Sequence, residues 1–457
     1  LVLMSATADA QLFADYMARV PGQPAKGRQG QAGGGGGGGL RAGQLTIPGF
    51  TYPVRDMYLE DVFETTGFQV GRSSKYARKG RDKEEGGEAA QEASLSGGGG
   101  GNYSDRTLAS LAVVDESQIN YDLLASLVTH IVEQQQSHGP KACLQGWQEG
   151  LAALKQAGDA GEGGAILVFL PGAPEISKAL RALVNCPALV SAAGGANKLR
   201  VLPLHGSLSS ADQSKVFPRA PPGVFKIVLA TNVAETSITI PDVSYVIDSG
   251  RAKEMQHDTD RGILRLQEQW VSQAAAQQRR GRAGRVRPGV CFRLYSRRQW
   301  GTMPSHTAPE ILRSPLESVC LLIKSMSGPG SVLQRAAGSA SSTLSVAEVL
   351  AQCLSPPPAP AVHAAVTLLR HIGAMTQPPT EELTALGHHL KAMPMDPRMG
   401  KMLVYGAMLG CLDPVLTIGA AMAHGRPVFL SGDRDQQADI AAARAPLLAP
   451  AVSARSD

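Results

Sequence analysis

The chain has 457 residues, of which 43% are hydrophobic, and a net charge of +5 from 44 Lys and Arg against 39 Asp and Glu. This length predicts about three domains and the apolar content is ordinary for a globular protein. The mild positive charge permits nucleic-acid binding without requiring it. The cysteines are scattered with no C-x-x-C pair, so neither a zinc site nor a disulfide framework is expected and a reducing compartment fits better. No apolar run approaches the ~20 residues that span a membrane.

The first hundred residues alternate between globular and low-complexity sequence. Residues 1–20 predict a strand, a turn and a short helix, and residues 45–68 again have globular composition. Two segments, 21–43 with seven consecutive glycines and 71–101 with charged and glycine-rich sequence, predict disordered insertions. The opening "LVLMSATA" is typical of the middle of a buried strand, so we expect this chain to be a fragment of a longer protein.

From about Tyr121 the pattern becomes α/β. A helix is expected after Asn120, a plausible N-cap. Short apolar runs that end in small or polar residues predict five strands, at 165–172, 198–206, 225–231, 243–250 and 289–296. Helices are expected between several of them, at 174–184, 209–217 and 272–280, and 309–326 is expected to be one amphipathic helix. Near-continuous apolar strands that alternate with helices predict a parallel sheet covered on both faces.

Four polar turns follow these strands. "LPG", "LHG", "ATNVAETS" and "DSG" all fall at carboxyl ends of predicted strands, which is where ligands bind in open α/β sheets. The richest is Leu229–Arg251, "LATNVAETSITIPDVSYVIDSGR". Its hydroxyl and amide groups suit phosphate or sugar oxygens, whereas a loop that stabilises its own turn would account for only about two of them.

An arginine cluster lies in "AAAQQRRGRAGRVRPGVCFRLYS", Ala274–Ser296. If the helix from Ser272 continued, Gln278, Arg282 and Arg285 would share one face at i, i+4 and i+7. Gly281 and Gly284 would lie on another face, where a neighbouring backbone can come close. Two guanidiniums and an amide aimed one way suit a compact polyanion. The alternative is a solvated basic loop that contacts nucleic-acid phosphates without preference.

Together these segments resemble the second half of a DEAH-box (DExH, RHA-type) ATP-dependent RNA helicase. The resemblance rests on "LVLMSATAD", "ILVFLPG", "LPLHGSLS", "IVLATNVAETSITIPDVSYVIDSGRAKE" and "QRRGRAGRVRPGVCFRLYS", in that order. It implies a RecA-like parallel sheet followed by a mostly helical winged-helix and partial ratchet-like domain.

The domain boundaries that it implies divide the chain into five parts. Residues 1–68 would end a first RecA-like domain, 69–104 would be an insertion or linker, and 105–300 would form the second RecA-like domain. Residues 301–400 would form the winged-helix domain, and 401–457 would begin the ratchet-like domain.

The resemblance also assigns residues. Gln278, Arg282 and Arg285 would be catalytic, facing the γ-phosphate of ATP, with the two arginines as arginine fingers. Arg279 would have a structural or inter-domain partner, and Arg280 would be solvated. The nucleotide would further contact Phe217, Gly250 and Asp242. The residues implied for RNA contact and for coupling to it are Ser5, Thr7, Thr231, Asn232, Glu235, Thr236, His205 and Gly206. Residues 257–262 would form the turn of a strand-separating hairpin.

The implied ligands are ATP with Mg²⁺ and single-stranded RNA, with ribonucleoprotein or ribosomal partners, in the cytoplasm or alternatively the nucleus. No G-x-x-x-x-G-K-[ST] and no DEAH tetrad occur in the sequence, so the Mg²⁺ ligands would lie mainly elsewhere, no metal site is expected, and this chain alone is predicted to be inactive. Two alternatives stay open: a non-catalytic RNA-binding or scaffold protein that reuses the fold, and a helicase that acts on DNA.

Overall fold

The computed structural model describes residues 10–19, 43, 45, 51–78, 103–139, 147–148, 150, 152–153, 164–236, 238–258, 263–327, 345–377, 380–423, 438, 441–442 and 445. The described residues up to Pro309 belong to one compact unit and those from Glu310 to a second. The amino-terminal helix is α1 (Ala10–Arg19).

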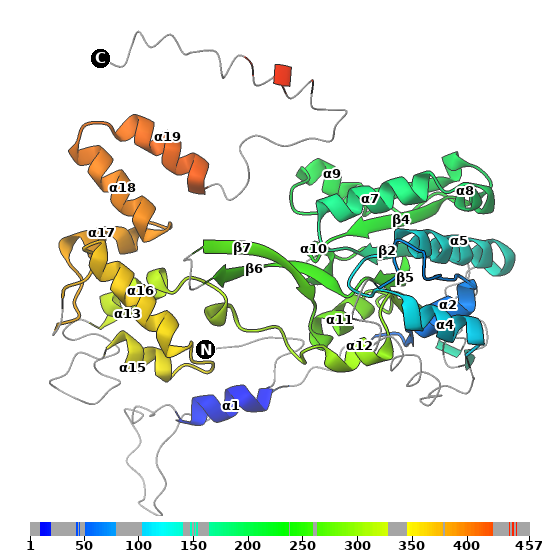
Figure 1. The fold of residues 1–457 in the computed structure, drawn as a ribbon, viewed down its shortest axis with the longest axis horizontal. Helices are drawn as coiled ribbons and strands as arrows, with labels where there is room; N and C mark the ends of the chain where they lie inside the picture. The colour runs from blue at the N-terminus through cyan, green and yellow to red at the C-terminus, as the bar shows by residue number, and fades with distance from the viewer. Residues whose placement is uncertain are drawn as a thin grey trace, which may run out of the picture. The chain divides into compact units, whose positions relative to one another are not determined.

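The first unit is built on a six-stranded parallel sheet with the order β1-β8-β5-β2-β4-β3 (Figure 1). Its strands are β1 (Val54–Met57), β2 (Ala165–Phe169), β3 (Leu199–Leu204), β4 (Phe225–Ala230), β5 (Val243–Asp248) and β8 (Gly289–Arg293). The five strands predicted from the apolar runs are confirmed, as is the parallel sheet.

The edge strand β1 was not predicted as part of this sheet. It pairs with β8 in the register Val54↔Gly289 to Met57↔Phe292. The boundary at residue 68 would place β1 and the helix α2 (Leu59–Thr66) in a preceding domain, whereas the ladder to β8 joins them to the sheet of residues 105–300. Four residues are too short a run for periodicity to show which sheet a strand extends.

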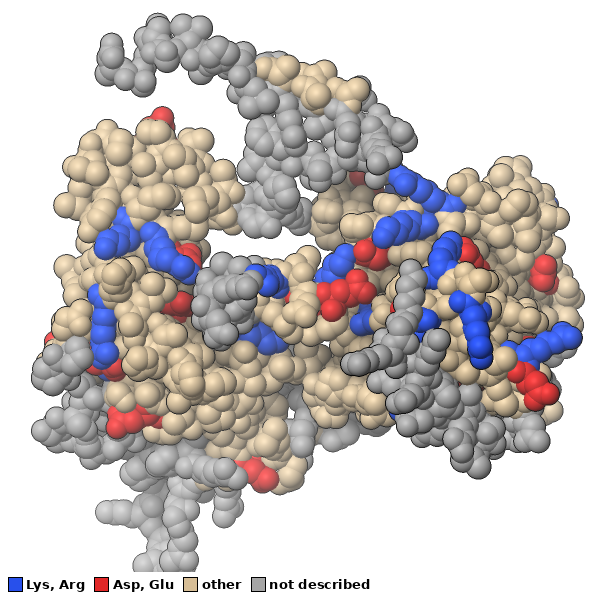
Figure 2. All heavy atoms as spheres, viewed as in Figure 1, with Lys and Arg blue, Asp and Glu red and all other residues tan. Residues whose placement is uncertain are grey.

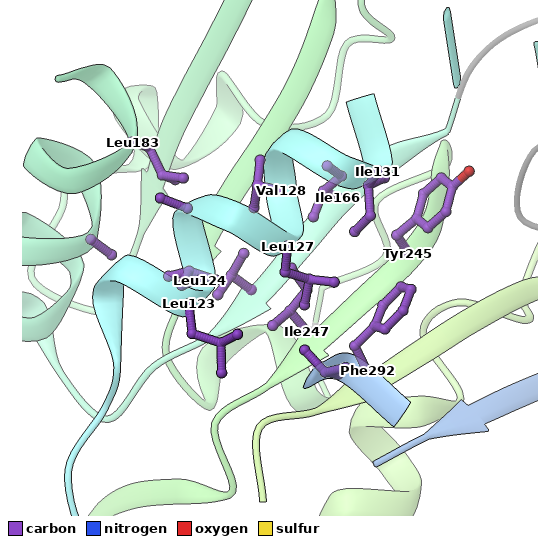
Figure 3. Packing of buried hydrophobic residues seen from close by; sticks show 14 of the residues in the cluster. Leu123, Leu124, Leu127, Val128, Ile131, Ile166, Leu183, Tyr245, Ile247 and Phe292 are labelled. Carbon is purple, nitrogen blue, oxygen red and sulfur yellow. The ribbon is translucent and has the colours of Figure 1, made fainter. Parts of the chain in front are cut away.

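Helices pack against one face of the sheet and bury the larger apolar cluster. They are α2, α4 (Asp105–Val113), α5 (Tyr121–His138), α7 (Ala173–Val184) and α8 (Pro187–Ala193). Leu123, Leu127 and Ile131 of α5 lie over Ile166 and Ile247 of the strands (Figure 3). Asn120 caps α5, as predicted, through its side chain, which accepts hydrogen bonds from the backbone N–H groups of residues 122 and 123.

The opposite face buries the alternate strand residues, such as Leu167, Val228 and Val246. Two return segments complete this second cluster. One follows β4 and contains α10 (Val233–Thr236), and the other contains α11 (Gln273–Arg280). Ala234 and Ile240 of the first and Ala283 of the second are buried in the cluster. The strand side chains therefore alternate between two cores, which explains why the strands are apolar almost throughout.

Three short elements complete the first unit. The 3₁₀ turn η3 (Ala196–Lys198) precedes β3, the helix α12 (Arg297–Thr302) follows β8, and α9 (Ser210–Ser214) is shorter than the predicted helix at 209–217. The strands β6 (Arg251–Asp258) and β7 (Ile263–Trp270) form a separate antiparallel hairpin. This confirms the predicted hairpin, although the ladder continues to the pair Asp258↔Ile263, beyond the expected start of the turn at His257.

The second unit is helical. It contains η4 (Glu310–Leu312), α13 (Glu317–Met326), α15 (Val346–Ala351), α16 (Ala359–His371), α17 (Ala385–Ala392), α18 (Pro397–Met408) and α19 (Leu412–Ala423), with one isolated bridge, Met375↔Leu383. The prediction of one helix over 309–326 is wrong. Pro315 lies between η4 and α13, and a proline both lacks the N–H that a helix needs and disfavours helical backbone in the preceding residue.

Gly284 is required by close packing. Its carbonyl accepts a hydrogen bond from the Tyr52 N–H at 2.9 Å. A Cβ at Gly284 would lie 2.5 Å from the Tyr52 carbonyl oxygen and 2.7 Å from a methyl group of Val54. This confirms the predicted close approach of a neighbouring backbone at Gly284. At Gly281 the prediction is wrong, because a Cβ there would meet only carbonyl oxygens of its own helix.

We therefore expect Gly284→Ala to lower the free energy of unfolding by about 1–3 kcal/mol, because the backbone of the edge strand must shift. Gly301→Ala is the control, since a Cβ there meets nothing within 4 Å. Chemical denaturation of both variants checks this, and equal stabilities would contradict it.

Glu60 gives the fold a pH dependence. It is buried on α2, and one carboxyl oxygen accepts a hydrogen bond from the Arg297 N–H at 3.0 Å, while the other has no partner among the described residues. Burial, aided by the nearby Glu116, raises the pKa of Glu60 from 4.5 to about 7.

Because this folded-state pKa lies above the unfolded value, the contribution of Glu60 to stability is full below about pH 4.5 and is lost as the pH rises through 7. We expect Glu60→Gln to match the unchanged protein near pH 4.5 and to be more stable by roughly 3 kcal/mol at pH 8. Denaturation at a series of pH values measures the difference, and a difference that does not change with pH would contradict the assignment.

Candidate functional site

The candidate site lies where two return segments run along the same face of the sheet. Residues 231–242 lead from the carboxyl end of β4 to the amino end of β5, and residues 271–288 lead from β7 to the amino end of β8. The helices α10 and α11 contact each other. Parallel strands require such returns, so the topology itself places the two segments together.

Three arginines at intervals of three residues join the two segments. Arg279 donates to a carboxylate oxygen of Glu235 at 3.1 Å. Arg282 donates to the Glu235 carbonyl at 2.9 Å and to the Ile238 carbonyl at 2.8 Å. Arg285 donates to the Thr239 hydroxyl at 2.5 Å. We call Arg279, Arg282 and Arg285 the arginine ladder.

The prediction that Gln278, Arg282 and Arg285 share a helical face is wrong, because α11 ends at Arg280. The N–H groups of Arg282 and Ala283 bond to carbonyls three residues back, at Arg279 and Arg280, so the chain tightens after the helix. Gln278 stays in the last turn of α11 and is partly exposed. The ladder therefore follows the loop 235–239 instead of one face of a helix.

Exposure distinguishes the members of the ladder. Arg279 is 1% exposed and Arg282 is 6% exposed, whereas Arg285 is exposed. Burial, together with the charge of Arg285, lowers the pKa of Arg282 to about 10. Of these three guanidiniums, that of Arg285 is the one open to a ligand.

Arg279 has the structural partners that the sequence predicts. Its guanidinium donates to Asp248, 2.8 Å away and fully buried, in addition to Glu235, and lies 5.0 Å from the centre of the Phe169 ring. Burial raises the pKa of Glu235, and the charge of Arg279 opposes this. A buried arginine that bridges two carboxylates is costly to disrupt, because each removal leaves an unpaired charge.

The network continues from Asp248 to the edge strand. The Tyr295 hydroxyl donates to Asp248 at 3.1 Å, and Arg293 donates to the Tyr295 hydroxyl at 2.7 Å and to Asp56 at 3.1 Å. Arg280 also donates to Asp56, at 2.7 Å, and to the Val54 carbonyl. The prediction that Arg280 is solvated is therefore wrong. We call this set the charge network: Asp56, Glu235, Asp248, Arg279, Arg280, Arg293 and Tyr295.

The network members other than Glu235, Arg279 and Arg280 were missed by the sequence analysis. A signal was available, because Arg293 lies within the apolar run "GVCFRLYS" and Asp248 within "VSYVIDSG". A charged residue inside a buried strand must find a partner. The sequence does not say which partner.

Four of the residues assigned to RNA lie together at the carboxyl ends of β3 and β4. The Thr231 N–H donates to the Leu204 carbonyl at 3.1 Å, which sets Thr231 beside His205. Gly206 and Asn232 are exposed and Thr231 is buried. The Ser207 hydroxyl lies 2.7 Å from Nδ1 of His205, and partial burial lowers the pKa of that imidazole.

Of the other residues assigned to RNA, only Glu235 has a described side chain. Glu235 points to Arg279 instead of the exposed edge. Ser5 and Thr7 lie outside the described residues, as does the side chain of Thr236, whose backbone ends α10.

The three residues assigned to the nucleotide are not brought together. Asp242 precedes β5 and Gly250 follows it, so a whole strand of ~20 Å separates them. Asp242 is buried and pairs with the buried Lys226 at 2.9 Å. Phe217, after α9, is 41% exposed.

Gly250 has a packing role. Its φ is +69°, and a Cβ there would lie 2.6 Å from the Tyr295 ring and 2.9 Å from the Trp270 ring. Only glycine fits both the backbone conformation and this space.

Charged side chains of both signs are mixed on the surface. On the face that Figure 2 shows, Lys and Arg side chains lie among Asp and Glu side chains. Within the described part of the chain, no group of three or more His, Cys, Asp or Glu could hold a metal ion. None of the described helices is long and apolar enough to cross a membrane.

We expect Arg279→Met to lower the free energy of unfolding by about 3–5 kcal/mol, because it leaves Asp248 buried without its cation. Arg280→Met is the matched control, since its pair with Asp56 is partly exposed on both sides and such pairs contribute about 1 kcal/mol or less. Urea denaturation of the two variants compares them, and equal losses would show that Asp248 does not depend on Arg279.

Comparison with known proteins supports one family. Residues 150–287 match the model of the helicase conserved C-terminal domain, and residues 396–455 match that of the ratchet-like helicase-associated domain (HA2). The chain is 38% identical over 448 residues to the DExH-box ATP-dependent RNA helicase DExH1 of Arabidopsis thaliana, which covers 96% of this chain and 38% of that protein. It is 37% identical over 465 residues to the ATP-dependent RNA helicase DHX29 of Homo sapiens, covering 96% of this chain and 29% of that protein.

The chain thus spans less than two fifths of the length of these curated relatives. The solved structure of the DExH-box NTPase HrpB of E. coli resembles it in fold, with a TM-score of 0.52 and 24% identity over 86% of this chain and 37% of that one. The two domain matches and the identity over nearly the whole chain show that it belongs to the DExH/DEAH-box family of helicases.

Proposed function

We propose that this chain acts within an ATP-dependent RNA helicase of DEAH type, which translocates on single-stranded RNA and separates duplexes or ribonucleoprotein contacts as it hydrolyses ATP. The arginine ladder is the main support for the proposal. Its three guanidiniums all bond to residues 235–239, and that of Arg285 is exposed. The names of the relatives, which are ATP-dependent RNA helicases, agree with it.

The members of the ladder have different roles. The guanidinium of Arg279 donates its hydrogen bonds to Asp248 and Glu235, so it positions the site and does not reach a ligand. Arg282 holds the carbonyls of Glu235 and Ile238, which fixes the loop and keeps a second positive charge beside Arg285. Arg285 is then the leading arginine finger, Arg282 supports it, and Gln278 in the last turn of α11 is the third residue proposed to face the phosphate. A guanidinium placed in advance stabilises charge that develops on a transferred phosphoryl group.

The residues of this chain fit a nucleotide in part. The exposed Arg285 suits a phosphate, and the exposed ring of Phe217 suits stacking on a base. ATP with Mg²⁺ would supply the phosphoryl group whose transfer drives movement. We assign no Mg²⁺ ligand to this chain. We reassign Asp242 to its ion pair with Lys226 and Gly250 to close packing against Tyr295.

The RNA contacts are proposed at the carboxyl ends of β3 and β4. Backbone and side-chain groups at Gly206, Thr231 and Asn232 would bind phosphate and sugar oxygens, which positions a strand without reading its sequence. The partners proposed beyond RNA are ribonucleoprotein or ribosomal, and the compartment proposed is the cytoplasm or alternatively the nucleus.

The full-length protein that contains this chain tests the proposal. We expect Arg285→Ala to lower kcat for RNA-stimulated ATP hydrolysis by about 10²–10³-fold, because a transition-state contact is lost. RNA affinity without nucleotide should stay within about twofold, since the RNA edge is separate from the ladder. Arg106→Ala is the control, because Arg106 is exposed on α4 at the other face of the sheet.

Hydrolysis by Arg285→Ala at the unchanged rate would contradict the role of the ladder. No hydrolysis by the unchanged full-length protein, with RNA binding intact, would favour a non-catalytic RNA-binding or scaffold protein.

A further inference from the structure

The hairpin β6–β7 is joined to the sheet at its base. Arg251 follows Gly250 directly, and the ladder pairs Arg251 with Trp270 at the base and Asp258 with Ile263 at the far end. Figure 1 shows both strands running out from the six-stranded sheet. Met255 and Leu266 in the outer part are exposed. The direction of the hairpin therefore depends on the contacts of its first few residues.

An ion pair joins the hairpin to the helix α7. Nζ of Lys253 lies 2.6 Å from a carboxylate oxygen of Glu175, and the two side chains are 24% and 13% exposed. Glu175 lies in the first turn of α7, which buries Ile176 and Leu183 against the sheet. The anion is thus fixed to the rigid part of the unit.

The turn after β2 is shaped to admit the lysine. A Cβ at Gly172 would lie 3.2 Å from both Cδ and Nζ of Lys253 and 3.0 Å from the Glu175 carboxylate. The lysine side chain therefore crosses close over the "LPG" turn. The sequence pattern marks this turn as a place for a ligand, and the hairpin occupies it.

Arg251 makes a second attachment on the same face of β6, since residues two apart share a face. Its guanidinium lies 3.9 Å from the centre of the Trp270 ring and donates to the Ser117 carbonyl at 2.8 Å. Trp270 in turn packs edge-on against Tyr295, with ring centres 5.9 Å apart. These contacts fix the base of the hairpin. Lys253 lies two residues further along β6, where an attachment restricts the angle of the hairpin more strongly.

The attachment divides the carboxyl edge of the sheet. The turns after β5 and β2, which are neighbouring strands, are filled by the hairpin base and by Lys253. The turns after β4 and β3, the next two strands, keep Asn232 and Gly206 exposed. The hairpin thus begins one strand away from the open half of the edge, and Lys253 lies over the turn between them.

We infer that Lys253 and Glu175 are positioning residues that hold the β6–β7 hairpin at a fixed angle to the open half of the sheet edge, so that RNA drawn along this edge is forced against the hairpin. The inference rests on the proposed function, because it assigns the ion pair to strand separation and not to ATP hydrolysis.

A charge-swap cycle in the full-length protein tests it: Lys253→Glu, Glu175→Lys and the double variant. We expect each single reversal to slow duplex unwinding about tenfold while RNA-stimulated ATP hydrolysis stays within about twofold, and the double variant to recover most of the unwinding rate. Lys253→Met keeps the aliphatic stem without a reversed charge and should fall between. Lys75→Glu is the control, because its pair with Asp122 is exposed on both sides.

Hydrogen–deuterium exchange of residues 251–258 and 263–270 gives a readout that does not depend on activity. We expect faster exchange in the single variants and recovery in the double variant, because an unanchored hairpin opens more often.

Unchanged exchange and unchanged unwinding in the single variants would overturn the inference, as would a double variant that recovers neither. If the unchanged protein does not unwind RNA, the proposed function fails, and the exchange cycle still decides whether the ion pair positions the hairpin.

Discussion

The buried pair of Arg279 and Asp248 is the interaction on which the site depends. The guanidinium is 1% exposed and the carboxylate is fully buried. Each charge would be costly to bury alone, so the two pair with each other. Because Arg279 lies on α11, Asp248 ends β5 and Glu235 lies on α10, the pair fixes three elements at once. The loop that Arg282 and Arg285 contact is held in place by this fixed frame.

The same network joins the edge strand to the site. Asp56 on β1 binds both Arg280 and Arg293, and Arg293 reaches Asp248 through Tyr295. A displacement of β1 would therefore disturb the packing of the arginine ladder. At the carboxyl edge of the sheet, the turns after β5 and β2 contact the hairpin, whereas the turns after β4 and β3 keep Asn232 and Gly206 exposed. In the proposed function, phosphate chemistry and RNA contact would therefore use different segments of the chain, residues 271–288 and the turns after β3 and β4.

Sequence reasoning was reliable where a local pattern decides the structure. The five apolar runs became strands because no other element buries both faces of such short segments. It failed where a single residue interrupts a pattern, as at Pro315, and where helical spacing was extended past Arg280. Gln278, Arg282 and Arg285 do not share the helical face that the sequence analysis gave them, and Gln278 is not part of the arginine ladder. The assigned roles of the ladder and of the edge residues remain predictions.

The amino-acid sequence by itself determined the α/β class, the parallel sheet and the segment that carries the arginines, because each follows from apolar periodicity or from residues close together in the chain. The hairpin was expected only from the family resemblance. Only the tertiary structure decided which arginine is exposed, that Arg280 binds Asp56, that Asp242 pairs with Lys226, that Gly250 packs against Tyr295, and that Lys253 fills the turn after β2. These are contacts between residues up to 224 positions apart. A charged or small residue in the sequence shows that it needs a partner or space, and only the folded chain shows what supplies it.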